Sequence, residues 1–367
     1  MAPQGRVIVI GAGVFGLWCA WECLARGFAV TVIDRGGPGA GASGGVVGAL
    51  APHRPEPWTA EKAFQIAALR SLPRALAGIE AVSGIACGWR RVGRAQPLAD
   101  APARRRAEAL AEAAARHWPG VRVRILPPGA MAHWIDPAAA PAGILHEELT
   151  ARLDPAATCR ALARAVARRG GRFLRARALA VAPGRVDSDA GRLSGDAVVI
   201  AAGADSFALA GLPGGAVKGQ AALLAARPGV MPVISARETW IVAHQRPGGG
   251  VAVGSTREES WHDAAATDAR LDGVIARARA ICPPLRTAPV LRRWAGLRPR
   301  AASRKPLIGP LPGAGRVLLC TGGLGISFAI GQRAGAAIAA LIAGTDPDLP
   351  EIFLPARAIP SVSRVTP

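Results

Sequence analysis

Three glycines near the start of the chain, Gly11, Gly13 and Gly16, have the spacing GxGxxG. The continuous apolar run 6–10 comes directly before them, and a helical pattern over 14–26 begins within the hexamer. Where a strand passes into a helix in this way, the first glycine permits a tight turn and the second lets a pyrophosphate approach the backbone. The third lets the helix pack closely on the strand. Because a helix N-terminus attracts phosphate, the pattern predicts a dinucleotide-binding site.

The choice of dinucleotide depends on the residues that follow. Asp34 comes directly after the predicted strand 29–33, where a carboxylate accepts hydrogen bonds from the adenosine ribose hydroxyls. After Arg35, residues 39–45 form a second loop of small residues, which can wrap backbone amides and a hydroxyl around the far end of a larger dinucleotide. Simple nicotinamide enzymes have no need of such a loop. We therefore predict FAD rather than NAD.

Hydrophobic periodicity predicts the elements that position these residues. Strand 6–10, helix 14–26 and strand 29–33 form a βαβ unit, which implies a parallel sheet with a right-handed crossover. Further helices are expected at 60–82, 103–117, 154–169 and 326–343, and further strands at 173–180, 197–201 and 316–320. The short strands expected at 221–226, 240–243 and 251–254 fit an antiparallel sheet better.

Length and composition limit the class of protein. A chain of 367 residues favours two domains, and an apolar content of 50% excludes wholesale disorder. No secretory pattern precedes the first strand, and glycines, Gln332 and Arg333 interrupt the longest apolar stretch, so we expect a cytoplasmic protein without a membrane span. The six cysteines lack a metal-binding or CxxC spacing, which predicts buried structural thiols and no metal site.

The formal net charge of +20 raises the question of a nucleic-acid partner. Clustered cations bind nucleic acid by releasing the counterions of its phosphates. Of the 45 basic residues, however, all but Lys62, Lys218 and Lys305 are arginine, and they are spread along the chain. The charge is therefore typical of a compositional bias, and we expect no nucleic-acid partner.

Longer segments resemble the D-amino-acid oxidase-like (DAO) family of FAD-dependent oxidoreductases, which includes glycine oxidase, D-amino-acid oxidase and sarcosine oxidase. The resemblance covers nearly the whole chain, and WAGLRP before the last glycine turn is its most selective motif. In chain order its segments are IVIGAGVFGLWCAWECLARGFAVTVIDR, GAGASGGVVGALAP, RLDPAATCRALARAVARRGG, VVIAAGADS, VKGQAALL, VAVGSTREES and WAGLRPRAASRKPLIGPLP.

This resemblance implies an α/β fold, in which an FAD-binding Rossmann-like domain of the GR2 type is interleaved with an α+β substrate domain containing an antiparallel sheet. We predict FAD-binding segments at 1–84, 151–215 and 293–345, substrate-domain segments at 85–150 and 216–292, and a C-terminal tail at 346–367.

The resemblance also implies how the cofactor is held. The loop after Ala42 would line the flavin, the backbone near Ala178 would meet the adenine side, and residues 323–327 would close over the isoalloxazine. The positive end of the following helix favours the anionic reduced flavin. Residues 300–305 hold no cysteine, so noncovalent FAD is expected. The predicted cofactor residues are Gly11, Gly13, Val14, Phe15, Gly16, Asp34, Arg35, Ala42, Ser43, Gly44, Val46, Val47, Gly48, Ala178, Gly203, Gly323, Leu324, Gly325, Ile326 and Ser327.

Arg298 matches the arginine that pairs with an amino-acid carboxylate in the family, and a planar guanidinium suits a planar carboxylate. Relatives often shape the substrate site with tyrosines, but this chain has none. Trp240 or His244 could take that place, although each also fits a core position. Arg298, Trp240 and His244 are therefore the candidate catalytic residues.

The implied reaction is the oxidation of a small amine or D-amino acid, as in glycine oxidase. Hydride passes from the α-carbon to flavin N5, and the imine hydrolyses to a keto acid plus an amine or ammonia. Oxygen, a quinone or an electron-transfer partner then accepts the electrons. Two alternatives stay open, a flavin module of tRNA wobble-uridine modification and a non-catalytic flavin-binding protein. The sequence leaves the substrate and the oligomeric state open.

Overall fold

The computed structural model describes residues 4–244 and 250–358. The chain divides into two compact units, each built from segments far apart in the sequence. Unit 1 comprises residues 1–41, 162–216 and 298–367, and unit 2 comprises residues 42–161 and 217–297. The two units are defined by the contacts within each of them, whereas the predicted domains are defined by what they bind. The FAD-binding and substrate-binding roles of the predicted segments therefore stay predictions. The end of the predicted tail, 359–367, lies outside the described residues.

The α-helices in the described residues are α1 Val14–Ala25, α2 Ala60–Ser83, α3 Ala101–His117, α4 Pro155–Arg168, α5 Asp205–Ala210, α6 Ala269–Ile281 and α7 Ser327–Ala343. The strands are β1 Arg6–Ile10, β2 Ala29–Asp34, β3 Ala49–Leu50, β4 Arg90–Arg91, β5 Arg94–Pro97, β6 Val123–Leu126, β7 Ile144–Glu147, β8 Ala151–Arg152, β9 Arg172–Arg175, β10 Ala178–Ala182, β11 Arg185–Ser188, β12 Gly191–Ser194, β13 Ala197–Ile200, β14 Gly214–Leu224, β15 Val233–Ala236, β16 Thr239–Ala243, β17 Val251–Gly254, β18 Val290–Ala301, β19 Leu307–Pro310 and β20 Val317–Thr321.

The main sheet of unit 1 has the strand order β19-β20-β13-β1-β2-β9. The strands from β20 to β9 run parallel, and β19 pairs antiparallel with β20 at one edge. β1 and β13 are almost wholly buried, which explains why their sequences are continuously apolar. The predicted parallel βαβ unit is confirmed.

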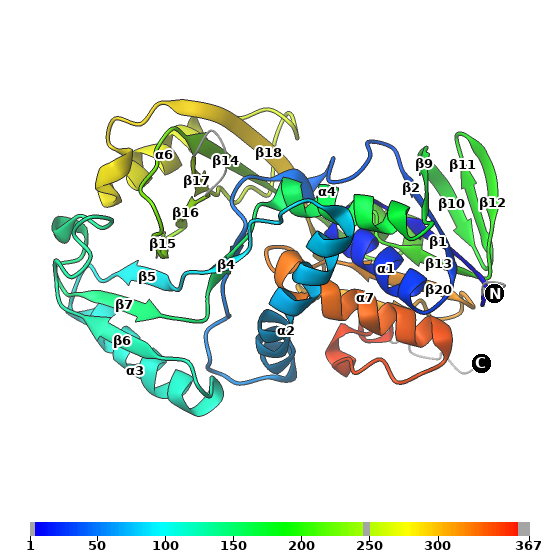
Figure 1. Ribbon diagram of the computed structural model, residues 1–367, viewed down its shortest axis with the longest axis horizontal. Coiled ribbons are helices and arrows are strands. Elements are labelled where there is room, and N and C mark those ends of the chain that lie inside the picture. The colour runs from blue at the N-terminus through cyan, green and yellow to red at the C-terminus, as the bar shows by residue number, and fades with distance from the viewer. Residues whose placement is uncertain (1–3, 245–249, 359–367) are drawn as a thin grey trace, which may run out of the picture. The chain divides into compact units, whose positions relative to one another are not determined.

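Helices α1 and α7 lie side by side in unit 1 (Figure 1). Two glycines of α7 make this approach possible. A Cβ added at Gly335 would lie 2.7 Å from the backbone of Trp18, and one added at Gly331 would lie 2.8 Å from the Trp18 ring. Because interiors are close-packed, neither position tolerates a side chain without a shift of α1, the helix that follows the GxGxxG turn.

The single strand predicted over 173–180 is wrong, because β9 ends at Arg175 and β10 begins at Ala178. Ala176 N still donates to Asp34 O (3.2 Å), beside the end of β2. Arg177 N then donates to the Asp189 side chain (2.9 Å), and the chain turns into a separate antiparallel sheet, β10-β11-β12. A side-chain hydrogen bond therefore interrupts an otherwise uniform β pattern.

Unit 2 is built on a sheet with the strand order β18-β14-β17-β16-β15-β5-β7-β6. β14, β17, β16 and β15 pair antiparallel, as predicted, whereas β15 pairs parallel with β5. Ile234 and Ile241 on one face pack against Leu271 of α6. Val233 and Val242 on the opposite face pack against Val46. Alternate residues of each strand thus belong to two different clusters.

The cysteines agree with a further expectation. All six cysteines are buried and free, as predicted for structural thiols. Burial raises the pKa of the Cys159 and Cys282 thiols to about 12, so both stay protonated at neutral pH. Within 4–244 and 250–358, no helix combines the length and the apolar character that a membrane crossing requires.

Candidate functional site

The predicted dinucleotide turn joins β1 to α1. Gly11 has a φ of 108°, a conformation that favours glycine, and its N–H donates to Ile33 O (2.8 Å). A Cβ at Gly11 would lie 2.3 Å from Ala201 O, and one at Gly16 would lie 1.9 Å from Gly11 O. Gly13, at the N-cap of α1, supplies no side-chain cap. The packing roles assigned to the first and third glycines thus have a geometric basis.

Asp34, the predicted ribose contact, also supports this turn. One carboxylate oxygen accepts a hydrogen bond from Ala12 N (2.8 Å), and the other accepts from Gly36 N (2.7 Å) and Gly37 N (2.8 Å). A carboxylate has about four lone-pair sites, so a ribose hydroxyl could still donate to it. No pattern in the sequence indicates these three hydrogen bonds.

The predicted adenine-side residues lie near the carboxyl ends of β2 and β9. Asp34 pairs with Arg175 across these strands, and Ala178 follows three residues later at the start of β10. Arg35 forms an exposed ion pair with Asp205 (3.2 Å). The structure therefore places Ala178, Asp34 and Arg35 at one edge of the unit 1 sheet.

The second glycine turn of unit 1 connects β20 to α7. Thr321 Oγ1 donates to Gly203 O (2.8 Å), which links the ends of β20 and β13. A Cβ at Gly323 would lie 2.4 Å from Ser327 Oγ and 2.7 Å from Phe15 Cζ, so Phe15 packs against this turn. Three residues predicted to bind the cofactor, Phe15, Gly323 and Ser327, are thus brought together from two segments.

Pro299, the residue after Arg298 in β18, forms a backbone hydrogen bond to the same turn. Leu324, whose φ is 42°, donates its N–H to Pro299 O (3.2 Å). The Arg298 side chain is half-buried. Arg298, the predicted carboxylate-binding residue, therefore directly precedes Pro299, whose carbonyl oxygen contacts the predicted flavin turn at Leu324.

Three glycines near the predicted cofactor turns of unit 1 are sterically open. A Cβ added at Gly37, Gly203 or Gly325 would meet no atom within 4 Å. Gly203 and Gly325 are predicted cofactor residues, and Gly37 is bound by the Asp34 carboxylate.

The predicted flavin-lining segment 42–48 belongs to unit 2. It starts with a 3-10 turn, Ala42–Gly44, in which Ser43 O accepts a hydrogen bond from Cys159 Sγ (3.6 Å). A Cβ at Gly48 would lie 2.0 Å from Leu153 O. The segment is thereby fixed at both ends.

His244, a predicted catalytic candidate, contacts this segment directly. Its side chain is buried, and Nε2 lies 2.8 Å from Val46 O and 3.1 Å from Val47 O. Since carbonyl oxygens only accept hydrogen bonds, Nε2 carries the proton. These contacts indicate that His244 positions the backbone at Val46 and Val47, rather than acting as a proton acceptor through Nε2.

Trp240, the other pocket candidate, lies half-buried on the sheet face that packs against Val46. Trp294 lies on the same cluster, and its ring would be 3.3 Å from a Cβ added at Gly45. The guanidinium of Arg94 lies 5.9 Å from the Trp240 ring centroid. Trp240 and Trp294 thus pack in one cluster with the predicted flavin-lining segment, and Arg94 lies beside Trp240.

Sequence reasoning missed Trp294, Arg94 and its buried partner Glu147 as site candidates. Trp294 is the first residue of WAGLRP and could have been found from that motif. Arg94 was hidden among the many arginines of the chain. Its burial depends on the pairing of β5 with β15 and β7, which the sequence does not reveal.

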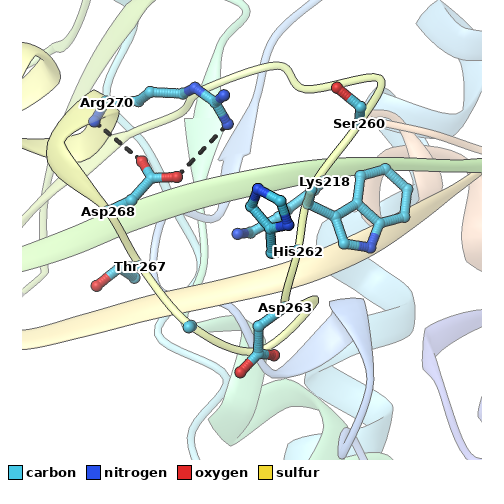
Figure 2. Close-up of a pocket in the computed structure, with 9 residues that line it drawn as sticks. Lys218, Ser260, His262, Asp263, Thr267, Asp268 and Arg270 are labelled. Atoms are coloured by element: carbon cyan, nitrogen blue, oxygen red, sulfur yellow. Dashed lines mark hydrogen bonds and ion pairs between the residues drawn. The ribbon is translucent and has the colours of Figure 1, made fainter.

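A separate pocket of about 320 Å³ lies beside α6, and Lys218, His262 and Arg270 are among its lining residues (Figure 2). By strand alternation, Lys218 shares the α6 face of β14 with Ala222, which packs in the α6 cluster. The pocket therefore lies on the sheet face opposite Trp240. The Lys218 ammonium is 3.7 Å from Glu258, and Arg270 is 2.9 Å from the same carboxylate.

The Glu258 carboxylate predicts how stability depends on pH. Burial acts to raise its pKa, but hydrogen bonds from Thr256, Gln220 and Arg270 and the nearby Lys218 together lower it below the usual value. A lowered folded-state pKa contributes stability above the unfolded value of about 4.3 and loses it as the pH falls through the folded value. We expect Glu258→Gln to be less stable than the unaltered protein at pH 7 and to lose less stability on acidification.

Urea unfolding midpoints between pH 7 and pH 3 measure this effect. Glu148→Gln, which removes a partly exposed carboxylate paired with Arg122 and Arg124, is the matched control and should cost only about 0.2–1 kcal/mol. Parallel pH curves for the unaltered protein and Glu258→Gln would contradict the assignment.

Comparison with known proteins agrees with these features. Residues 6–341 match the family model DAO, FAD dependent oxidoreductase. Glycine oxidase of Pseudomonas aeruginosa is 29% identical over 96% of this chain and 98% of its own length. The crystal structure of glycine oxidase from Geobacillus kaustophilus superposes with a TM-score of 0.89 at 20% identity, covering 97% of this chain and all of the other.

A shorter match concerns the tRNA 5-methylaminomethyl-2-thiouridine biosynthesis bifunctional protein MnmC of Psychrobacter sp. It is 50% identical, but over 14% of this chain and 7% of that protein. The full-length matches and the family model confirm the predicted fold, the FAD cofactor and the oxidoreductase class. The chain belongs to the DAO family of FAD-dependent oxidoreductases.

Proposed function

We propose that this protein oxidises the carbon–nitrogen bond of a small amine or amino acid, as glycine oxidase does. The observation that carries the proposal is the Leu324–Pro299 hydrogen bond (3.2 Å), which ties the carboxylate-binding candidate Arg298 to the glycine turn at α7. The full-length similarity to a glycine oxidase supports the same substrate class.

FAD, held noncovalently, supplies the hydride acceptor when bound. In unit 1, Gly11, Gly13 and the N-terminus of α1 would hold its pyrophosphate, and Asp34 would accept from the ribose. The turn before α7 would face the flavin, because the positive end of a helix favours the charge of the reduced ring. In unit 2, the segment 42–48, held by His244 and Gly48, would contact the flavin.

Arg298 would bind and orient the substrate carboxylate, and Trp240 would limit the space around the substrate. Orientation of this kind accounts for much of the rate when no side-chain base is required. The imine product would hydrolyse to a keto acid plus an amine or ammonia. Oxygen, a quinone or an electron-transfer protein would accept the electrons. Six buried free thiols are compatible with our proposal of a cytoplasmic protein.

Anaerobic titration of the yellow holoprotein tests the proposal. Glycine, sarcosine, D-alanine, D-proline and larger D-amino acids are added in turn, and bleaching of the flavin band is followed. We expect one class of amine to reduce the flavin. If dithionite reduces the bound flavin and no amine does, the amine-oxidising function is wrong.

A second candidate is the flavin-dependent step of tRNA wobble-uridine modification. The short MnmC match favours it. Binding of total tRNA that weakens steeply with salt, together with no flavin reduction by free amines, would support this alternative.

A further inference from the structure

A pocket of about 390 Å³ lies in unit 1, where the start of β14 meets the end of β18. Its charged lining residues are Arg300 and Arg304. The other residues that line it are small: Gly214, Gly215, Ala216, Ala301 and Ala302. Because a guanidinium does not lose its proton in a protein, this arginine pocket, as we call it, stays positively charged throughout the neutral pH range.

The pocket beside α6 has a different balance of charge. There, Lys218 and Arg270 both pair with Glu258, and Arg270 also pairs with Asp268 (Figure 2). Carboxylates of the protein therefore neutralise the cations of that pocket. Among the described residues, those that line the arginine pocket include no carboxylate. A cleft lined by charge of one sign concentrates ions of the opposite sign, so the arginine pocket favours an anion.

Arg304 occupies a backbone position that suits glycine better than arginine. Its φ is 58°, in the left-handed region, and its N–H donates to Ala301 O (2.9 Å) in a tight turn. Glycine adopts this conformation without strain, whereas a residue with a Cβ does not. Strained residues of this kind cluster at ligand-binding sites. The turn itself does not account for an arginine, so we look to the pocket for the role of this side chain.

The glycine at position 215 is required by neither packing nor conformation. A Cβ added there would meet no atom within 4 Å, and its φ lies outside the left-handed region. Gly214 is different, because its Cβ would lie 2.4 Å from the Phe207 ring. Gly214 thus fixes the start of β14 against α5. The absence of a side chain at Gly215 keeps the pocket open and lets a ligand approach the backbone.

The two walls of the arginine pocket are joined by contacts within unit 1. Ala302 N donates to Pro213 O (3.4 Å), directly before β14. Ala301 is buried, and a Cβ added at Gly322 would lie 3.4 Å from Ala301 Cβ and 3.2 Å from Lys305 O. Fixed walls favour binding, because fewer groups must be ordered when a ligand arrives.

Charge and size together indicate the class of ligand. A phosphate monoester carries a charge of about −1.5 to −2 at pH 7, which matches two guanidinium groups better than the single charge of a monocarboxylate does. Guanidinium also binds phosphate through two parallel N–H···O hydrogen bonds. A volume of about 390 Å³ is in the range of small-molecule sites, so an organic group has room beside the phosphate.

We propose that Arg300 and Arg304 bind the phosphate group of a small phosphorylated molecule, whose organic part lies over the glycine and alanine residues of the pocket. This site goes beyond the proposed function, because binding there requires no oxidation of an amine.

Equilibrium dialysis of the holoprotein against radiolabelled inorganic phosphate tests the site. FAD occupies its own phosphate-binding turn in this experiment, so that turn does not contribute. The pH is 8, at which phosphate is mainly a dianion, and sodium chloride keeps the ionic strength constant. We expect one saturable site per chain. Methyl phosphate should displace the label at least as well as unlabelled phosphate, and acetate should do so at least 10-fold less well.

Arg304→Gly should weaken phosphate binding by about 10- to 100-fold, the factor that a hydrogen bond to a charged group supplies. Its melting temperature should stay the same or rise, because glycine relieves the strained φ. Arg304→Lys keeps the charge and should lose less affinity than Arg304→Gly. Arg300→Gln should also weaken binding and is the second test of the same site.

Arg237→Gly is the matched control. Arg237 also has a positive φ, 52°, and lies exposed in the turn between β15 and β16 of unit 2. The substitution removes the same charge and relieves the same kind of backbone strain, and it should leave phosphate binding unchanged. No saturable binding, unaltered affinity in both Arg304→Gly and Arg300→Gln, or an equal loss in Arg237→Gly overturns the proposal.

The dialysis is independent of flavin reduction, so the two proposals are tested separately. Phosphate binding that depends on Arg304 stands even if no amine reduces the flavin. Oxidation of an amine by a protein that binds no phosphate leaves the proposed function intact and overturns the phosphate site alone.

Discussion

Arg298→Ala is expected to lower kcat/KM for a carboxylate-bearing amine by about 100- to 1,000-fold. Removing one partner of a desolvated, hydrogen-bonded charge pair costs about 2–5 kcal/mol, and the expected loss of activity corresponds to about 3–4 kcal/mol, within that range. The loss should be smaller for Arg298→Lys, because lysine keeps the charge but not the bidentate geometry. Steady-state kinetics with the substrate identified by flavin bleaching measure both effects.

The control for Arg298→Ala is Arg292→Ala, which removes an exposed arginine from the same strand. The FAD content of both variants should match that of the unaltered protein. A kcat/KM within threefold of the unaltered value for Arg298→Ala, with FAD fully bound, would exclude Arg298 as the carboxylate ligand.

The second large effect is expected for Gly16→Ala, which should yield protein largely free of FAD. The new Cβ would lie 1.9 Å from Gly11 O, so α1 must move away from the turn that would hold the pyrophosphate. Overpacking of this kind costs about 1–3 kcal/mol of folding free energy, apart from the loss of cofactor. The flavin-to-protein absorbance ratio and the melting temperature measure the two consequences.

Gly78→Ala is the matched control for this variant. Gly78 lies in α2, and a Cβ there would meet no atom within 4 Å. Since alanine favours a helix over glycine by about 1 kcal/mol, this variant should be slightly more stable and retain FAD. Full FAD occupancy in Gly16→Ala would show that the turn is not the cofactor site.

Local patterns predicted the elements of unit 1 well. The GxGxxG turn and α1 followed from the glycine spacing and an apolar run, because the spacing reports contacts within about 30 residues of chain. Residues 173–180 were misread, because the Asp189 side chain that caps the backbone at Arg177 is invisible to a periodicity argument.

Long-range contacts explain what the sequence could not show. His244 was a candidate catalyst by residue type, yet its Nε2 contacts Val46 O, 198 residues earlier in the chain. Arg94 acquires its position beside Trp240 through strand pairings between distant segments. Neither contact produces a local sequence pattern. The neighbours of these two side chains could therefore not be predicted from the sequence.

The segmented course of the chain has a consequence for how the protein folds during synthesis. Arg6 N donates to Asp196 Oδ2, 190 residues later, and β13 pairs in turn with β20 near the C-terminus. The apolar edge of β13 thus stays without its β20 partner until residues 317–321 have left the ribosome. Nonlocal pairing is slow, and an exposed strand edge pairs readily with other chains. Low temperature and early access to chaperones should therefore raise the fraction of this protein that reaches its folded state.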